Sequence, residues 1–514
     1  MHVVRGASGL LLGMAALLPV RAGAAETESP AAPPAVIPVA AVAPSGTPAP
    51  AAPAPASKPK RSLILSGSLR LRQEVWDWFG SGDQGSYSFT GSLLRYGATY
   101  TTPKHDLTLE LEQPTLLGLP DDATLGAPLG QLGQGASYKD ANGSQEASLF
   151  IKQAFWRFKG LGDPSNSARL GRFEVIDGTE TMPKDPSLAW MKRERIAHRL
   201  LGTFGFTHVG RSFDGGQFVH NTPDLNVTLF GGMPTKGVFD LDGGSTLDDV
   251  KVGYAAATKP LKLGHFTGET RLFGLYYQDG REGVVKVDNR PGPVRAADTD
   301  DVSITTIGGH AIGTWDTPLG KVDGLLWAAG QFGNFGNLDQ RAYAFAAETG
   351  FQPKGMKWSP WFRAGYNRYS GDGDNTNGTH GTFFPVLPTP RIYARFPFYT
   401  EANLNDAFLQ VVAKPTPKLT LRSDLHSLSL ADRNDLWYGG GGAFNRPTFG
   451  YAGRPSNGKS YLATVLDLSA DYQLRKYTTL SGYVGYAFGG EVIDSIYSGS
   501  STGFLGYVEL TQKF

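Results

Sequence analysis

Arginine and acidic residues occupy the same polar face of segments in which apolar and polar residues alternate. The arginines on this face are Arg70, Arg72, Arg95, Arg271, Arg363 and Arg422. The acids are Glu74, Glu110, Glu112, Glu269, Asp424 and Asp467. Guanidinium groups bind carboxylates bidentately, so these arginines could line a lumen and bind an anionic solute. They could equally pair with the acids across neighbouring strands as a structural ladder, and both interpretations stay open.

The densest basic cluster contains Lys192, Arg193, Arg195 and Arg199. If this segment is a short helix, Arg195 and Arg199 lie on one face. A connector that folded into a pore would place this charge at the constriction. We favour the alternative, a solvated loop helix or a contact to anionic lipopolysaccharide.

A calcium loop is the metal site that the spacing of oxygen ligands suggests. Asp372 and Asp374 begin the segment 372–378, which has oxygen ligands at alternating positions. Phe383 stands where a calcium loop needs glutamate, so we expect an ordinary polar surface loop and no cofactor.

A hydrolase is the alternative from another class. Asp424, His426 and Ser427 are the right residue types, but Ser427 must point away from the other two on a strand. The chain has no nucleophile elbow, zinc-binding His-Glu-x-x-His helix or phosphate loop, and its nine histidines are scattered. Zero cysteines exclude a thiol nucleophile. We therefore predict that the protein is not an enzyme.

The segments that carry these residues read as β-strands. Leu107, Leu109 and Leu111 alternate with Thr108, Glu110 and Glu112, a period of two that fits strands with lipid or core on one side and water on the other. No apolar stretch after the N-terminus is long enough for a membrane helix. The near-neutral charge of the 514-residue chain argues against binding nucleic acid.

The connections between strands alternate between short and long. Short turns are predicted at 102–105, 162–165, 221–224, 259–260, 316–318, 352–354, 414–417 and 473–476. Long polar connectors are predicted at about 114–146, 177–209, 279–301, 370–403 and 430–459. This alternation predicts an all-β fold, a transmembrane antiparallel up-and-down barrel of about 18 strands, with short periplasmic turns and long extracellular loops.

The ends of the chain fit export to an outer membrane. Residues 1–24 have the pattern of a Sec-type signal peptide, residues 25–61 form a tether rich in Pro and Ala, and residues 62–514 form the barrel. Five of the 48 basic and two of the 47 acidic residues precede residue 62, which leaves the barrel a net charge of −2. The chain ends on Phe514 after an amphipathic segment, which predicts recognition by the barrel-assembly machinery.

Several motifs resemble those of the alginate export family of outer-membrane porins. They are Leu170-Gly171-Arg172-Phe173-Glu174, Arg211-Ser212-Phe213-Asp214-Gly215-Gly216, Ser370-Gly371-Asp372-Gly373-Asp374, and Asp424-Leu425-His426 with Leu466-Asp467-Leu468. The resemblance implies a single eighteen-stranded barrel, and it adds Arg172 and Arg211 to the pore candidates. The best-known members pass an anionic polyuronate through an arginine-lined lumen.

The near-neutral barrel favours a less specialised function than the resemblance implies. We predict a monomeric outer-membrane porin, in contact with lipid and lipopolysaccharide, that passes polar carbohydrate or organic-acid solutes, with anionic ones among the candidates. A dedicated exporter of an anionic polysaccharide such as alginate is the alternative.

Overall fold

The computed structural model describes residues 61–442 and 450–514. The predicted signal peptide, and all of the predicted tether except Arg61, lie outside these residues.

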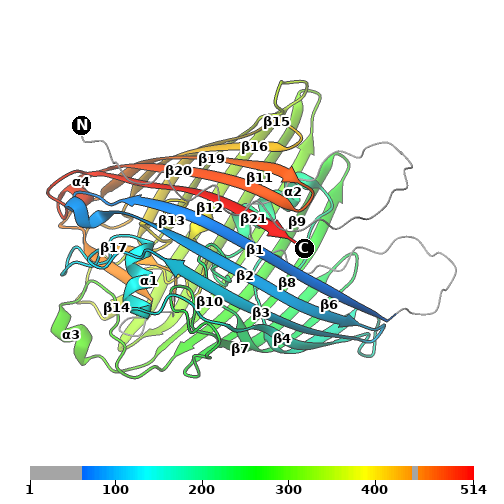
Figure 1. Cartoon of the computed structure of the whole chain (residues 1–514), viewed down its shortest axis with the longest axis horizontal. Helices are drawn as coiled ribbons and strands as arrows, with labels where there is room; N and C mark the ends of the chain where they lie inside the picture. Colours follow the sequence, from blue (N-terminus) through cyan, green and yellow to red (C-terminus); the bar gives the residue numbers. More distant parts are fainter. Residues whose placement is uncertain (1–60, 443–449) are drawn as a thin grey trace, which may run out of the picture. The chain divides into compact units, whose positions relative to one another are not determined.

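Eighteen strands form a closed antiparallel barrel, in which each strand pairs with the next along the chain and β1 pairs with β21. In Figure 1 the first strand, in blue, accordingly lies beside the last, in red. The strands are β1 (Ser62–Asp77), β2 (Ser86–Thr101), β3 (His105–Leu117), β4 (Phe150–Lys159), β5 (Asn166–Phe173), β6 (Phe213–Asn221), β7 (Asn226–Pro234), β8 (Val250–Leu263), β9 (Phe266–Asp279), β10 (Val302–Asp316), β11 (Gly320–Phe335), β12 (Leu338–Pro353), β13 (Trp361–Tyr369), β15 (Leu404–Thr416), β16 (Leu419–Ser429), β19 (Tyr461–Arg475), β20 (Thr478–Gly489) and β21 (Thr502–Lys513). The predicted fold class and strand number are confirmed.

The remaining elements lie in the connections at one end of the barrel, which we call the long-loop end. They are the strands β14 (Thr379–His380), β17 (Leu436–Gly440) and β18 (Tyr451–Pro455), and the helices η1 (Gly82–Gly85), α1 (Gln134–Asn142), α2 (Pro186–Met191), η2 (Lys192–Ile196), α3 (Gly292–Ala297), η3 (Pro390–Ile392) and α4 (Glu491–Asp494). No helix in the described part of the chain has the length and apolarity that crossing a membrane requires.

Two predicted connections differ from the structure. Lys259 and Pro260 lie inside β8, and the chain turns instead at Gly264 and His265, where Gly264 adopts the left-handed φ of +57° that glycine tolerates. On the long-loop side, β11 and β12 are joined by residues 336–337 alone, so the predicted alternation of short turns and long loops fails at this connection, which is a tight hairpin.

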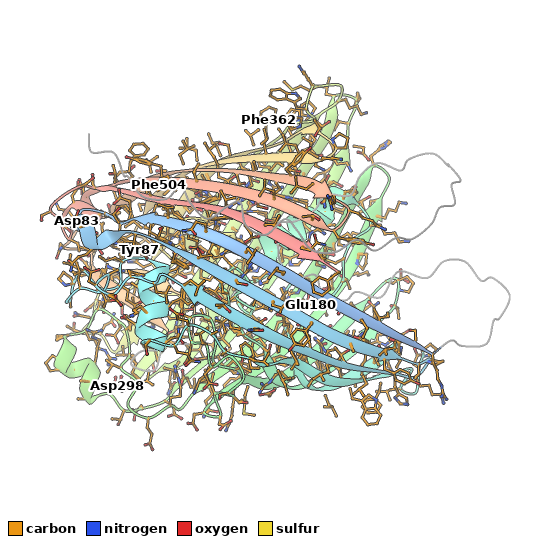
Figure 2. All side chains as sticks on the ribbon, in the orientation of Figure 1. Asp83, Tyr87, Glu180, Asp298, Phe362 and Phe504 are labelled. Atoms are coloured by element: carbon orange, nitrogen blue, oxygen red, sulfur yellow. The ribbon has the colours of Figure 1, made fainter. Side chains whose placement is uncertain are left out.

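The outer face of the barrel is apolar. Leu272 on β9 is 73% exposed and Leu326 on β11 is 62% exposed, whereas Arg271 and Trp327 beside them are buried inside. Exposed aromatic side chains such as Trp156, Phe362 and Tyr486 also lie on strands (Figure 2 labels Phe362). A continuous apolar outer face on a closed barrel is the surface that a lipid bilayer covers.

The first and last strands close the barrel at a seam beside the terminal aromatic residue. The backbone groups of Gly67 and Phe514 exchange two hydrogen bonds, of 2.9 and 3.1 Å. A Cβ atom on Gly67 would lie 2.1 Å from the ring of Phe514, so a larger residue there would require this exposed terminal ring to shift.

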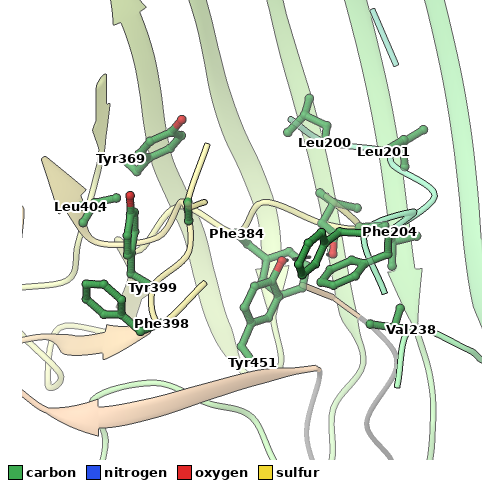
Figure 3. Close-up of a cluster of buried hydrophobic side chains, with 14 of the residues drawn as sticks. Leu200, Leu201, Phe204, Val238, Tyr369, Phe384, Phe398, Tyr399, Leu404 and Tyr451 are labelled. Atoms are coloured by element: carbon green, nitrogen blue, oxygen red, sulfur yellow. Dashed lines mark hydrogen bonds between the residues drawn. The ribbon is translucent and has the colours of Figure 1, made fainter. Parts of the chain in front are cut away.

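Long loops fold into the barrel and pack together. Residues 174–212 pair with the loop 370–403 through backbone hydrogen bonds from Gly202 to Leu387 and from Leu387 to Leu200, of 2.8 and 2.9 Å. Leu200, Leu201 and Phe204 of the first loop belong to the same buried cluster as Phe384 of the second loop and Tyr451, and Figure 3 shows Phe204 near Tyr451. The loops therefore share one hydrophobic core with the inner wall.

Candidate channel constriction

The loop between β5 and β6 carries a short helix into the barrel. Asp185 caps α2, because one of its carboxylate oxygens accepts hydrogen bonds from the backbone N–H groups of Ser187 and Leu188, at 2.9 and 3.0 Å. Pro186 occupies the first helical position, where its missing N–H costs nothing. The other oxygen of Asp185 binds Lys321 on β11 at 2.6 Å, which fixes the start of the helix to the wall.

The basic cluster after this helix faces the wall and not solvent. Lys192 binds Glu269 on β9 at 2.7 Å, and the guanidinium of Arg195 donates hydrogen bonds of 2.7 and 2.8 Å to the two carboxylate oxygens of Glu348 on β12. Arg199 donates to Tyr369 on β13 at 2.6 Å. The predicted solvated helix is therefore wrong for these three side chains, whose exposed fraction is at most 2%. Arg193 alone in the cluster stays partly exposed.

Glu348 is the centre of this network. Besides Arg195, it binds Arg363 at 3.0 Å and lies 3.6 Å from Arg199, so one carboxylate serves three guanidinium groups. Arg363 also binds Asp323 on β11 at 2.8 Å. A buried charge is tolerated only when it is paired, so the network ties the loop to the wall.

The opposite wall is also neutralised by pairing. Arg72 binds Glu509 on β21 at 2.6 Å and Glu74 at 3.1 Å, while Arg95 binds Glu112 on β3 at 2.5 Å. Arg70 instead donates to backbone carbonyls of the infolded loop, those of Gly205, Phe206 and Thr207. Arg72 and Arg95 therefore pair with acids of neighbouring strands, as the structural-ladder hypothesis predicts. Arg70 instead holds the infolded loop against the wall.

Arg271 on β9 has its partners in the loop. It binds Glu180 at 2.8 Å and also the hydroxyl of Tyr254. Nearby, burial raises the pKa of the loop residue Asp177 to about 6, although Arg271 and two backbone N–H donors oppose the shift. Burial lowers the pKa of His198 to about 3, so this loop histidine adds no positive charge at neutral pH.

Arg172 is a predicted pore residue, but it lies on the outer side of the barrel wall. Its neighbour Phe173 is buried inside, and alternation places Arg172 with the 60% exposed Leu170 on the outer face, near the long-loop end. There it forms a bidentate pair with Asp214, at 2.6 and 2.7 Å. The Gly-Arg and Arg-x-Phe-Asp-Gly motifs thus meet at the rim, and the pore assignment of Arg172 is corrected.

Replacing Arg172 with alanine should therefore cost stability and leave conduction alone. We expect a loss of roughly 1–2 kcal/mol, because a partly exposed bidentate pair is removed. Urea unfolding in detergent would measure the loss, and bilayer recordings should show unchanged ion selectivity. A changed reversal potential would return Arg172 to the pore.

The loop between β13 and β15 contributes two arginines that strand periodicity could not reveal. The guanidinium of Arg391 lies 4.4 Å from the ring centre of Phe206 and 4.5 Å from that of Tyr483. Two of its nitrogens, Nε and Nη2, have no hydrogen-bond partner among the described residues. Arg395 lies 4.0 Å from Asp424. Arg211 is a further buried loop cation, and it donates to the carbonyl of Gly441 at 2.6 Å.

The remaining site candidates divide between the lumen and the loops. Arg422 binds Asp424 at 2.7 Å and Glu194 of the infolded loop at 3.3 Å, while Asp467 lies beside Asp424 on the next strand. Asp372 and Asp374 instead accept hydrogen bonds from the backbone of their own loop, and no group of three potential ligands forms around them in the described residues.

A closed barrel of 18 antiparallel strands with an apolar outer face and loops folded inside defines an outer-membrane channel. The model of the alginate export family matches residues 129–496, and the chain belongs to this family. No curated protein sequence matches the chain.

Solved outer-membrane proteins share the fold at low sequence identity. OpdK of Pseudomonas aeruginosa, crystallised with vanillate, is 10% identical with a TM-score of 0.52, over 88% of this chain and 98% of that chain. OccD3 (OpdP) of the same organism is 11% identical with a TM-score of 0.52, over 88% and 91%. A BenF-like porin from Pseudomonas fluorescens Pf-5 is 10% identical with a TM-score of 0.51, over 88% and 98%.

Proposed function

We propose that the channel passes small polar solutes, with a preference for anionic carbohydrates or organic acids, passively down their gradients. The observation that carries this proposal is the infolded loop 174–212, whose basic side chains Lys192 and Arg195 bind the wall carboxylates Glu269 and Glu348. A loop held across a barrel by buried ion pairs narrows the lumen at a fixed level. Such a constriction selects by width and charge and needs no catalysis.

The pairing of the wall arginines favours this function over dedicated export of a polyanion such as alginate. Arg72, Arg95 and Arg363 already bind carboxylates of the wall, so a polyuronate would have to compete for them. Among the described residues, Arg391 and Arg211 are loop cations without a carboxylate in ion-pair contact. This smaller positive excess supports a preference for small anions.

A hydrolase is not supported at the site that the sequence offers. Ser427 is exposed, whereas His426 and Asp424 are buried inside. The hydroxyl therefore lies on the opposite face of β16 from the imidazole, and we propose no catalytic role for these residues.

We propose Sec-dependent export through residues 1–24 and insertion by the barrel-assembly machinery, which would read the strand that ends at Phe514. We further propose that the barrel is a monomer surrounded by lipid and lipopolysaccharide.

Planar-bilayer recordings test the proposed function. We expect the folded protein to conduct, with a chloride-favouring reversal potential in a potassium chloride gradient. Small organic anions should compete for the current, whereas oligouronates longer than the constriction should block it. Free passage of long oligouronates would instead support the exporter, and the absence of conductance would reject both functions.

Conduction should depend on pH through acids buried in the loops. Burial raises the pKa of Asp177 to about 6 and those of Glu401 and Asp435 to about 7. An acid whose pKa is higher in the folded state stabilises that state below its unfolded pKa, near 4, and loses this stabilisation as pH rises through the folded value. The packed loops should therefore loosen between pH 5 and pH 8.

We expect the open probability to rise and anion preference to fall across this pH range. Conductance at pH 5.5 and pH 8 measures both effects. Asp435→Asn should flatten part of the response, while Asp374→Asn, a change at an exposed loop residue, should leave it intact. Identical conduction at both pH values would contradict the role of the buried acids.

A further inference from the structure

A buried histidine in the lumen wall lies between carboxylates on both sides. His426 on β16 has its Nδ1 atom 2.8 Å from Asp406 on β15, and its Nε2 atom 3.9 Å from Oδ2 of Asp467 on β19. Asp424 is two residues before His426 on the same face. All four residues are at most 3% exposed.

Two of these carboxylates face each other directly. Asp424 and Asp467 are register partners on neighbouring strands, an arrangement that is destabilising unless a cation lies between the two side chains. Potential ligand atoms of Asp424, His426 and Asp467 lie within 4.8 Å of one another. Ligand atoms around a tetrahedral zinc ion are roughly 3.3 Å apart, so small side-chain rotations would bring the three ligand atoms to this spacing.

An unsatisfied oxygen points into the same space. Oδ1 of Asp467 accepts a hydrogen bond from Tyr483, but Oδ2 is buried and has no hydrogen-bond partner among the described residues. Leaving a buried carboxylate oxygen unsatisfied is costly, and this oxygen is the one nearest Nε2 of His426. The geometry therefore offers a nitrogen and an oxygen donor aimed at one point.

Asp406 completes the pattern seen around metal-binding histidines. When a histidine binds a metal through one ring nitrogen, the other usually donates to a carboxylate, which fixes the tautomer and orients the ring. The contact of 2.8 Å between Nδ1 and Asp406 supplies this partner and leaves Nε2 free to be the ligand.

The charges around the cluster restrict the ion that could bind. Arg422 and Arg395 lie 2.7 and 4.0 Å from Oδ2 of Asp424, so Asp424 is the weakest of the three ligands. A mixed set of one imidazole and carboxylates suits zinc and the neighbouring first-row transition metals, whereas calcium requires a larger number of oxygen ligands. Arg422 and Glu194 are partly exposed and border the cluster, which gives an ion a path from the lumen.

We propose that His426, Asp467 and Asp424 bind one divalent transition-metal ion, Zn²⁺ by preference, in the wall of the channel. Asp406 is a positioning residue for the imidazole. The ion would lie in the 3.9 Å gap between Nε2 of His426 and Oδ2 of Asp467. This site is separate from the solute function, since it lies in the wall and is formed by β16 and β19.

Cobalt titration of the folded full-length barrel in detergent tests the site, because Co²⁺ replaces Zn²⁺ and absorbs visible light. We expect one equivalent of Co²⁺ to give visible bands that Zn²⁺ abolishes. His426→Ala should remove the bands, and Asp406→Asn should weaken binding about 10–100-fold. His310→Ala is the matched control, because it also deletes a buried lumen histidine paired with an acid, Glu269, and it should bind as the wild type does.

Two results would overturn the proposal. In the first, the wild-type protein binds no Co²⁺ at pH 7.5, which shows that the cluster is not a metal site. Alternatively, His426→Ala binds Co²⁺ as tightly as the wild type, which places the ion elsewhere. The wild-type titration decides the first point even if a variant fails to fold.

Discussion

Glu348→Gln should release the infolded loop and give the largest change in conduction of any single substitution in the wall. The substitution removes the one carboxylate that Arg195, Arg199 and Arg363 share. Breaking a buried pair from one side costs about 3–5 kcal/mol, because the remaining charge stays buried without compensation. Arg363 keeps Asp323, so the cost falls on the loop arginines.

The expected outcome is a wider and more anion-selective lumen. Arg195 gains stability by leaving the wall and reaching water, and the segment 192–199 moves with it. Single-channel conductance should rise several-fold, and the reversal potential in a potassium chloride gradient should shift towards chloride. A lower unfolding midpoint in urea should accompany both changes.

Glu110→Gln is the matched control for this prediction. Glu110 is also a lumen acid in contact with an arginine, but its distance to Arg95 is 3.8 Å and Arg95 keeps Glu112 and Glu174. We expect little change in conductance. If the folded Glu348→Gln barrel conducts like the wild type, the tie between loop and wall does not set the constriction.

The barrel could be predicted from sequence because the pattern of each strand depends only on residues within that strand. Each strand carries its own alternation of outward and inward side chains, as Leu425 on the outer face and His426 on the inner face show. The long connector 370–403 was predicted at its observed bounds, since polar, Gly-rich chain interrupts the period of two on both sides. The predicted turn at Lys259 and Pro260 is wrong because proline usually marks a turn, whereas this proline lies near the end of strand β8.

The constriction could not be predicted in the same way because it depends on contacts between distant segments. Arg195 and Glu348 are 153 positions apart, and nothing in either segment specifies the other. Whether a basic loop enters the barrel depends on the carboxylates that line the wall opposite. Arg391 lies in the short helix η3 of a long loop, where no strand periodicity assigns a face, so its position between Phe206 and Tyr483 appears only in the structure.

Arg391→Ala should give the largest loss of anion preference. Arg391 is 6% exposed, and its guanidinium is flanked by the rings of Phe206 and Tyr483 and has no carboxylate in ion-pair contact among the described residues. A unit charge acts on an ion 4 Å away with about 4 kcal/mol at an effective dielectric constant of 20, and with about 1 kcal/mol in bulk water. Even the lower value corresponds to a several-fold change in the ratio of chloride to potassium permeability.

Arg391→Lys separates the charge from the stacking. Lysine keeps the positive charge but has no planar group to lie between two rings, so anion preference should survive while stability falls by roughly 1–2 kcal/mol. Reversal potentials and urea midpoints for the two variants give the comparison. If Arg391→Ala retains the reversal potential of the wild type, the positive excess in the lumen comes from elsewhere. Paired arginines such as Arg72 would then have to act on solutes despite their carboxylate partners, and that result would favour the polyanion exporter.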